Sequence, residues 1–140
     1  MSLYSQTLAG IHLLVVEDSP DNRDLLVFVL KNEGALVTAV GLAHEALLTL
    51  DRLKPDAILC DIRLPDGNGY ELIREWRERE KRLGLFPIPA IAVTVSVSEQ
   101  DRQMAYDSGF QLYVTKPYDI LSIPKSIAKL IAPVVSSKKP

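Results

Sequence analysis

The chain has 140 residues, about the length of one domain, since single domains cluster near ~100–150 residues. Sixteen Lys and Arg residues against eighteen Asp and Glu residues leave a formal net charge of −2. This balance argues against a nucleic-acid binder, which needs a basic face to neutralise phosphates. The single cysteine, Cys60, excludes an internal disulfide and a multi-cysteine zinc site.

Hydrophobic residues make up 47% of the chain and charged residues 24%, which is enough to bury a core. No apolar run reaches about 18 residues, and the N-terminus lacks the basic and apolar regions of a signal peptide. We therefore expect a soluble, cytoplasmic protein that contacts no membrane. The predicted organisation is an N-terminal extension over 1–10, one domain over 11–132 and a polar tail over 133–140.

Strand and helix patterns alternate in the first half of the chain. Residues 11–16 form a short apolar run typical of a buried strand. Ser19 and Pro20 are a cap and a first-turn proline, which predict a helix over 20–32. The core face of this helix is expected from Leu25, Leu26, Val29 and Leu30. A second strand over 35–40 and a second helix over 43–53 follow.

The second half continues the alternation. The predicted strands are 57–61, 88–93 and 112–114, and the predicted helices are 70–83, one capped by Ser98 that ends at Gly109, and 121–132. Five apolar strands alternating with five helices indicate βαβ units. The sequence therefore predicts one α/β domain with a doubly wound five-stranded parallel sheet covered on both faces.

Polar side chains stand where the predicted strands end, and ligands of open parallel sheets bind beyond that edge. The first strand ends in Glu17 and Asp18, the third in Asp61, the fourth in Thr94, and the fifth runs into Lys116. Three neighbouring carboxylates repel one another unless a cation neutralises them. Oxygen ligands of this kind suit Mg²⁺, and the lysine then supplies a charge for an anion held against the metal.

Each of these residues also has a simpler explanation. Glu17 and Asp18 could cap the next helix, Asp61 could be an ordinary loop residue, and Lys116 a solvated surface lysine. Thr94 could reflect strand propensity alone. Placed together on one edge, however, they favour a site over four unrelated coincidences.

Four strings resemble the receiver domain of response regulators in two-component signalling. They are Leu14-Val-Val-Glu-Asp-Ser-Pro-Asp-Asn22, Ile58-Leu-Cys-Asp-Ile-Arg-Leu-Pro-Asp-Gly67, Ala92-Val-Thr94 and Tyr113-Val-Thr-Lys-Pro117. The resemblance spans about residues 11–132. It implies the flavodoxin-like strand order 2-1-3-4-5, which the spacing alone does not give.

The resemblance also implies a role for each site residue. Asp61 is expected to be the phosphoacceptor, Lys116 to pair with a phosphoryl oxygen, and Thr94 to donate its hydroxyl to the phosphoryl group in the active state. Tyr113 is expected to be an aromatic switch that follows Thr94. None of these roles involves turnover of a separate substrate, so we do not expect an enzyme in that sense.

A magnesium site is implied in the same way. Asp18, Asp61 and the main-chain carbonyl of Arg63 are expected to ligate Mg²⁺, with Glu17 acting mainly through metal-bound water. The resemblance further implies a cis peptide bond between Lys116 and Pro117. Three features depart from the family pattern: the bulky Val95 after Thr94, Gln111 in place of an acidic residue, and a longer segment over 78–89.

The implied partners are a histidine kinase or histidine phosphotransfer protein and a downstream protein that binds the fourth helix, fifth strand and fifth helix. A weak homodimer is also compatible with the sequence. The main alternative is a degenerate receiver that only binds proteins, against which the intact site residues argue. A haloacid-dehalogenase-type phosphatase needs a second Asp where Arg63 stands, and a dinucleotide enzyme needs a glycine-rich first turn, which is absent.

Overall fold

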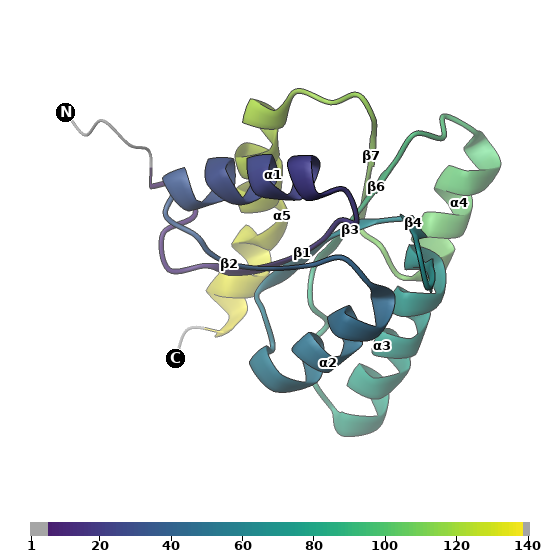
Figure 1. The fold of residues 1–140 in the computed structure, drawn as a ribbon. Helices are drawn as coiled ribbons and strands as arrows, with labels where there is room; N and C mark the ends of the chain where they lie inside the picture. The colour runs from purple at the N-terminus through teal and green to yellow at the C-terminus, as the bar shows by residue number, and fades with distance from the viewer. Residues whose placement is uncertain (1–5, 139–140) are drawn as a thin grey trace.

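A computed structural model describes residues 6–138 of the chain, with side chains through residue 132 (Figure 1). In chain order the elements are β1 (His12–Val16), α1 (Pro20–Asn32), β2 (Leu36–Val40), α2 (Ala43–Leu53), β3 (Ala57–Asp61), β4 (Arg63–Leu64), β5 (Gly67–Asn68), α3 (Gly69–Leu83), β6 (Ala90–Thr94), α4 (Glu99–Ser108), β7 (Leu112–Thr115), a 3₁₀ turn (Ile120–Ser122) and α5 (Ile123–Lys138).

Five strands form one parallel sheet in the order β2-β1-β3-β6-β7. This order is 2-1-3-4-5 when only the sheet strands are counted, so the predicted doubly wound fold is confirmed. The register pairs Val16 with both Val40 and Cys60, and Asp61 with Val93. Because β1 and β3 are neighbours, the carboxylates that follow β1 lie beside the last residue of β3.

Helices cover both faces of the sheet and enclose two cores. On one face lie α1 and α5 (Figure 1). They contribute Leu26, Leu30 and Ile127 to the first core. On the other face, α2, α3 and α4 cover the sheet, and Trp76 of α3 is fully buried in the second core. A strand buried on both sides has a continuous apolar sequence, as β3 does.

Leu25 does not lie in the core, contrary to the sequence prediction. Its side chain is 50% exposed, whereas Leu26 and Leu30 are buried. Residues four apart share a helix face, so Leu26 and Leu30 make the buried stripe and Leu25 faces away from it. Val29 is only partly buried.

Three further features differ from the predicted elements. The two-residue strands β4 and β5 form an antiparallel hairpin directly after β3, where only a turn was predicted. The last helix continues to Lys138, into the segment predicted as a tail. Residues 1–5 of the predicted extension lie outside the described residues, but Leu8 is fully buried and its amide donates to the carbonyl of Glu33. The domain boundaries themselves stay predictions.

Within residues 6–138, no helix is both long and apolar enough to cross a membrane.

Helix α3 carries a buried carboxylate, Glu80, that fixes the loop leading into β6. Its Oε2 accepts hydrogen bonds from Trp76 Nε1 at 3.0 Å and from the amide of Ile88 at 2.7 Å, and its Oε1 pairs with Arg77 at 2.8 Å. Arg77 in turn donates to the carbonyl of Gly109 at the end of α4. This network fixes the longer segment after α3 at the amino ends of β6 and β7, away from the carboxylates at the other ends of the strands.

We predict that Glu80→Ala lowers the free energy of unfolding by about 3 kcal/mol, because it leaves buried donors without an acceptor. Chemical denaturation followed by the fluorescence of Trp76 measures the loss. Glu78→Ala, at an exposed position on the same helix, is the matched control and should stay within about 0.5 kcal/mol of the wild type. Equal stabilities of the two variants would contradict the anchoring role of Glu80.

Candidate functional site

The predicted strand-end residues meet in one small pocket at the carboxyl edge of the sheet. The pocket has a volume of about 120 Å³ and is lined by Asp18, Asp61, Arg63, Thr94, Val95 and Lys116. Glu17 does not line the pocket but is buried close to Asp61. The structure therefore brings together the residues that the sequence placed at four separate strand ends.

The three carboxylates form the acidic part of this site. Glu17 and Asp61 are buried and Asp18 is exposed, and one oxygen from each lies within 4.8 Å of the other two. Closely spaced carboxylate oxygens are the ligands that Mg²⁺ prefers, and the exposed position of Asp18 leaves room for water on the cation. The donor set therefore fits a hard divalent cation. Arg63 lies in the hairpin beside the pocket, and ligation by its carbonyl stays a prediction.

Lys116 is the cation that the chain itself supplies to this cluster. Its Nζ donates to Asp61 Oδ2 at 3.0 Å and to Glu17 Oε2 at 3.3 Å. Its amide donates to the carbonyl of Thr94 at 2.7 Å, which holds the start of the loop against β6. The peptide bond between Lys116 and Pro117 is cis, as the family resemblance implies.

The surroundings of Asp61 disfavour its charged form. Burial and, after it, the neighbouring Glu17 carboxyl raise its pKa from 3.8 to about 7, although Lys116 acts in the opposite direction. For Lys116, burial lowers the pKa, but Asp61 and Glu17 more than compensate, so the net shift is upward. One ammonium therefore does not offset the burial and mutual repulsion of the carboxylates.

Thr94 and Tyr113 are linked through the main chain of Ser96. The Thr94 hydroxyl accepts a hydrogen bond from the amide of Ser96 at 3.2 Å, and the Tyr113 hydroxyl donates to the Ser96 carbonyl at 2.9 Å. The Ser96 hydroxyl donates to Asp101 in the first turn of α4. Tyr113 is buried, and the guanidinium of Arg102 lies 5.6 Å from the centre of its ring. The predicted switch residues are thus connected to α4 as well as to the pocket.

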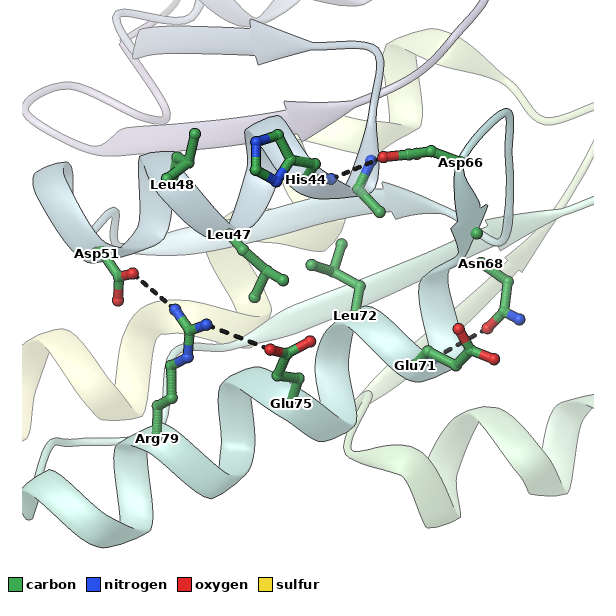
Figure 2. A pocket seen from close by; sticks show the side chains of 12 residues that line it. His44, Leu47, Leu48, Asp51, Asp66, Asn68, Glu71, Leu72, Glu75 and Arg79 are labelled. Carbon is green, nitrogen blue, oxygen red and sulfur yellow. Dashed lines mark hydrogen bonds and ion pairs between the residues drawn. The ribbon is translucent and has the colours of Figure 1, made fainter.

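One hydrogen-bonding contact near the site is not predicted by the sequence. Asp66, at the tip of the β4–β5 hairpin, accepts hydrogen bonds from the amides of Ala43 and His44 at the start of α2 (Figure 2). A signal for it was present, because Leu42, the residue before α2, has no side chain able to cap a helix.

We predict that Asp61→Asn raises the melting temperature of the metal-free protein. The raised pKa means that the folded state holds the Asp61 proton more tightly than the unfolded state. The resulting stabilisation of the wild type is full below about pH 4 and is lost as the pH rises through about 7. The advantage of Asp61→Asn should therefore grow between these values and level off above them.

Thermal unfolding from pH 4 to pH 8 in the presence of a chelator measures this difference. Asp24→Asn, at an exposed position of α1, is the control and should show no such trend. A wild type that gains stability relative to Asp61→Asn as the pH rises would contradict the prediction. Added Mg²⁺ should stabilise the wild type more than Asp61→Asn, because it binds the folded carboxylates.

Known proteins resemble this chain over most of its length. An uncharacterized 14.6 kDa protein from the sodA1 3′ region of Leptolyngbya boryana is 48% identical over 118 residues, which are 84% of this chain and 88% of that protein. Hybrid signal transduction histidine kinase D of Dictyostelium discoideum is 34% identical over 129 residues, which are 89% of this chain but only 8% of the kinase.

Solved structures share the fold. The receiver domain of a sensor histidine kinase from Pseudomonas aeruginosa PAO1, with a magnesium ion coordinated in its active site cleft, is 32% identical and has a TM-score of 0.78. The match covers 89% of this chain and 99% of that one. The receiver domain of the Francisella response regulator 1452 has a TM-score of 0.82 at 21% identity, and it supports the fold alone.

A family model described as the response regulator receiver domain matches residues 13–128. The match includes every strand end that lines the pocket. The chain therefore belongs to the response regulator receiver domain family.

Proposed function

We propose that this chain is a phosphorylation-controlled receiver that accepts a phosphoryl group on Asp61 from a histidine kinase or histidine phosphotransfer protein. The observation that carries the proposal is the cluster of Asp61, Lys116 and Glu17, in which the nucleophile and a cation lie 3.0 Å apart at the end of β3. A receiver of this kind acts in the cytoplasm and turns over no separate substrate.

The transfer is a displacement at phosphorus. A carboxylate oxygen of Asp61 attacks the phosphorus of a phosphohistidine, a P–O bond forms, and the P–N bond breaks. The imidazole leaves with the electron pair of that bond and takes up a proton. Lys116 then pairs with a phosphoryl oxygen instead of the free carboxylate, and Thr94 donates its hydroxyl to another.

A divalent cation fits this scheme. Asp18, Asp61 and the carbonyl of Arg63 would hold Mg²⁺, with Glu17 acting through its bound water. When bound, the cation offsets the carboxylate charge and the charge of the incoming phosphoryl group. The support for this assignment is the spacing of the three carboxylates and the magnesium ion coordinated in the related Pseudomonas receiver.

The surface beside the pocket offers a place for the donor protein. A hollow of about 510 Å³ adjoins Lys116, and its lining is mostly apolar. Leu25 and Val95 line it and are 50% and 61% exposed. Exposed apolar side chains next to a reactive group favour contact with a partner over contact with water. The bulky Val95, a departure from the family pattern, thus becomes part of the proposed donor contact.

A degenerate receiver that binds proteins without phosphorylation is the alternative. The same fold would serve it, but it would have no use for a buried nucleophile beside a lysine. The two functions differ in whether Asp61 is labelled.

We predict that the wild type gains one phosphoryl group from acetyl phosphate or phosphoramidate, and only when Mg²⁺ is present. Asp61→Asn should gain none, because the amide is not a nucleophile of comparable strength. Intact-protein mass spectrometry measures the added mass, and Asp24→Asn is the matched control that should be labelled like the wild type. Equal labelling of Asp61→Asn and wild type would overturn the assignment, and no labelling of either would favour the binding-module alternative.

Phosphorylation is also predicted to change the face formed by α4, β7 and α5, which is where we expect the downstream partner. When the Thr94 hydroxyl turns to a phosphoryl oxygen, the amide of Ser96 loses its acceptor and Tyr113 loses its fixed partner. Amide hydrogen exchange with and without a beryllofluoride phosphoryl mimic measures this. Protection at Ser96 and in the first turn of α4 should fall.

Thr94→Val is the control for this experiment, since it keeps the shape of the side chain and removes the hydroxyl. The mimic should then change exchange at Ser96 far less than in the wild type. Unchanged exchange in the wild type, with the mimic demonstrably bound, would contradict the proposed switch.

A further inference from the structure

Helix α2 begins without a local cap. The residue in the cap position is Leu42, whose side chain makes no capping hydrogen bond. The first amides of a helix have no partner within the helix, so they need an acceptor from elsewhere. By contrast, Ser19, Asn68 and Ser98 each cap their own helix with a side-chain oxygen.

The missing cap comes from Asp66, more than twenty residues further along the chain. Its Oδ1 accepts from the amide of Ala43 at 2.8 Å and its Oδ2 from the amide of His44 at 3.0 Å. Figure 2 shows the carboxylate reaching from the hairpin to the start of the helix. These two bonds lower the pKa of Asp66, so the group is ionised and also complements the positive end of the helix.

Asp66 lies at the tip of the β4–β5 hairpin, which follows Asp61, the proposed phosphoacceptor, in the chain. Arg63 pairs with Asn68 and Leu64 with Gly67, so Pro65 and Asp66 form the two-residue loop between them. The base of the hairpin is fixed as well: Ile62 donates to the carbonyl of Val93 at 3.0 Å, and Gly69 donates to the carbonyl of Ile62 at 2.8 Å. Arg63, which lines the pocket, lies between this fixed base and the tip.

We propose that Asp66 is a positioning residue for the cation pocket: by capping α2 from the hairpin tip, it holds the backbone around Arg63 in place beside Asp61. The inference rests on the proposed function, in which the Arg63 carbonyl and Asp61 hold Mg²⁺. Because Mg²⁺ requires a nearly ideal octahedral arrangement, a hairpin free to tilt at its tip binds the ion less tightly.

The alternative is that Asp66 stabilises α2 and does nothing for the pocket. The position of Leu42 separates the two roles. Leu42→Ser supplies a local capping hydroxyl to α2, so Leu42→Ser combined with Asp66→Ala restores the helix cap without restoring the link to the hairpin. A purely structural Asp66 is replaced by the new serine, whereas a positioning Asp66 is not.

The first experiment uses metal-free protein and measures amide hydrogen exchange. A capping hydroxyl accepts from the second or third amide of a helix, so in the double variant we expect the amides of residues 45 and 46 to be protected at least as well as in the wild type. The amides of residues 62–68 should exchange faster. Leu42→Ser alone should match the wild type in both segments. Equal protection of residues 62–68 in the double variant and the wild type would overturn the proposal, and this result does not depend on whether the chain binds Mg²⁺.

The second experiment measures the dissociation constant of Mg²⁺ by calorimetric titration of the same proteins. We expect it to rise about tenfold in the double variant and in Asp66→Ala. Asp66→Asn keeps one acceptor oxygen and so can hold only one of the two amides, and its dissociation constant should lie between those of the wild type and Asp66→Ala. Ser98→Ala, which removes the cap of α4, controls for a general loss of stability and should leave the affinity unchanged.

The outcomes distinguish this proposal from the proposed function. If the wild type binds Mg²⁺ and the double variant binds it equally well, Asp66 does not position the pocket and the receiver function stands. If Asp66→Ala binds Mg²⁺ as tightly as the wild type, the pocket does not need the link from the hairpin tip to α2 and the positioning role is wrong. If the wild type binds no Mg²⁺ and is not labelled on Asp61, both proposals fail together.

Discussion

Buried like charge at the carboxyl edge of the sheet is the constraint on which the rest of this structure depends. Glu17 and Asp61 are buried side by side and Asp18 is the exposed member of the cluster. Among the described residues, Lys116 is the one ammonium that pairs with Glu17 and Asp61. One lysine cannot balance three carboxylates, and burial together with the Glu17 carboxyl raises the pKa of Asp61 in spite of Lys116. The excess of negative charge suits the divalent cation of the proposed function.

Holding such a cluster together requires a rigid frame, and the sheet provides it. Main-chain amides just beyond three of the strands extend the hydrogen bonding of the sheet. The amide of Glu17 donates to the carbonyl of Val40, that of Ile62 to Val93, and that of Lys116 to Thr94. The backbone positions from which the carboxylates extend are therefore fixed as long as the strands stay paired. The two apolar cores on either face oppose that loss, and Glu80 fixes the far edge of the sheet, away from the charged one.

The sequence was informative wherever a pattern repeats locally. Strand and helix periods located the five sheet strands and their helices, and the strand ends located Asp61, Thr94 and Lys116, because parallel strands present their ends at one edge. The order of the strands came from the family resemblance instead, since periodicity carries no information on which strands are neighbours. Leu25 was misplaced because spacing by three and four admits two adjacent stripes, and only packing selects between them.

What the sequence did not reveal depends on contacts between distant segments. The β4–β5 hairpin has strands of two residues, too short for any period. Asp66 accepts a hydrogen bond from the amide of Ala43, and the buried Glu80 accepts one from the amide of Ile88. Each donor lies in a different segment from its acceptor. Leu42 indicates that α2 has no local cap, but the sequence does not show which distant residue supplies one.

The link from the pocket to α4 follows from the energies of the hydrogen bonds involved. In this structure the Thr94 hydroxyl accepts one neutral hydrogen bond from Ser96, worth about 0.5–1.5 kcal/mol. A bond to an anionic phosphoryl oxygen is roughly twice as strong, so in the proposed switch a phosphoryl group on Asp61 would outweigh the existing contact. Ser96, the residue that would lose its bond to Thr94, also binds Tyr113 and Asp101. It therefore connects Thr94 to the aromatic ring and to the first turn of α4. Under the proposed function, a single change of charge in the pocket would thereby change a surface made of other elements.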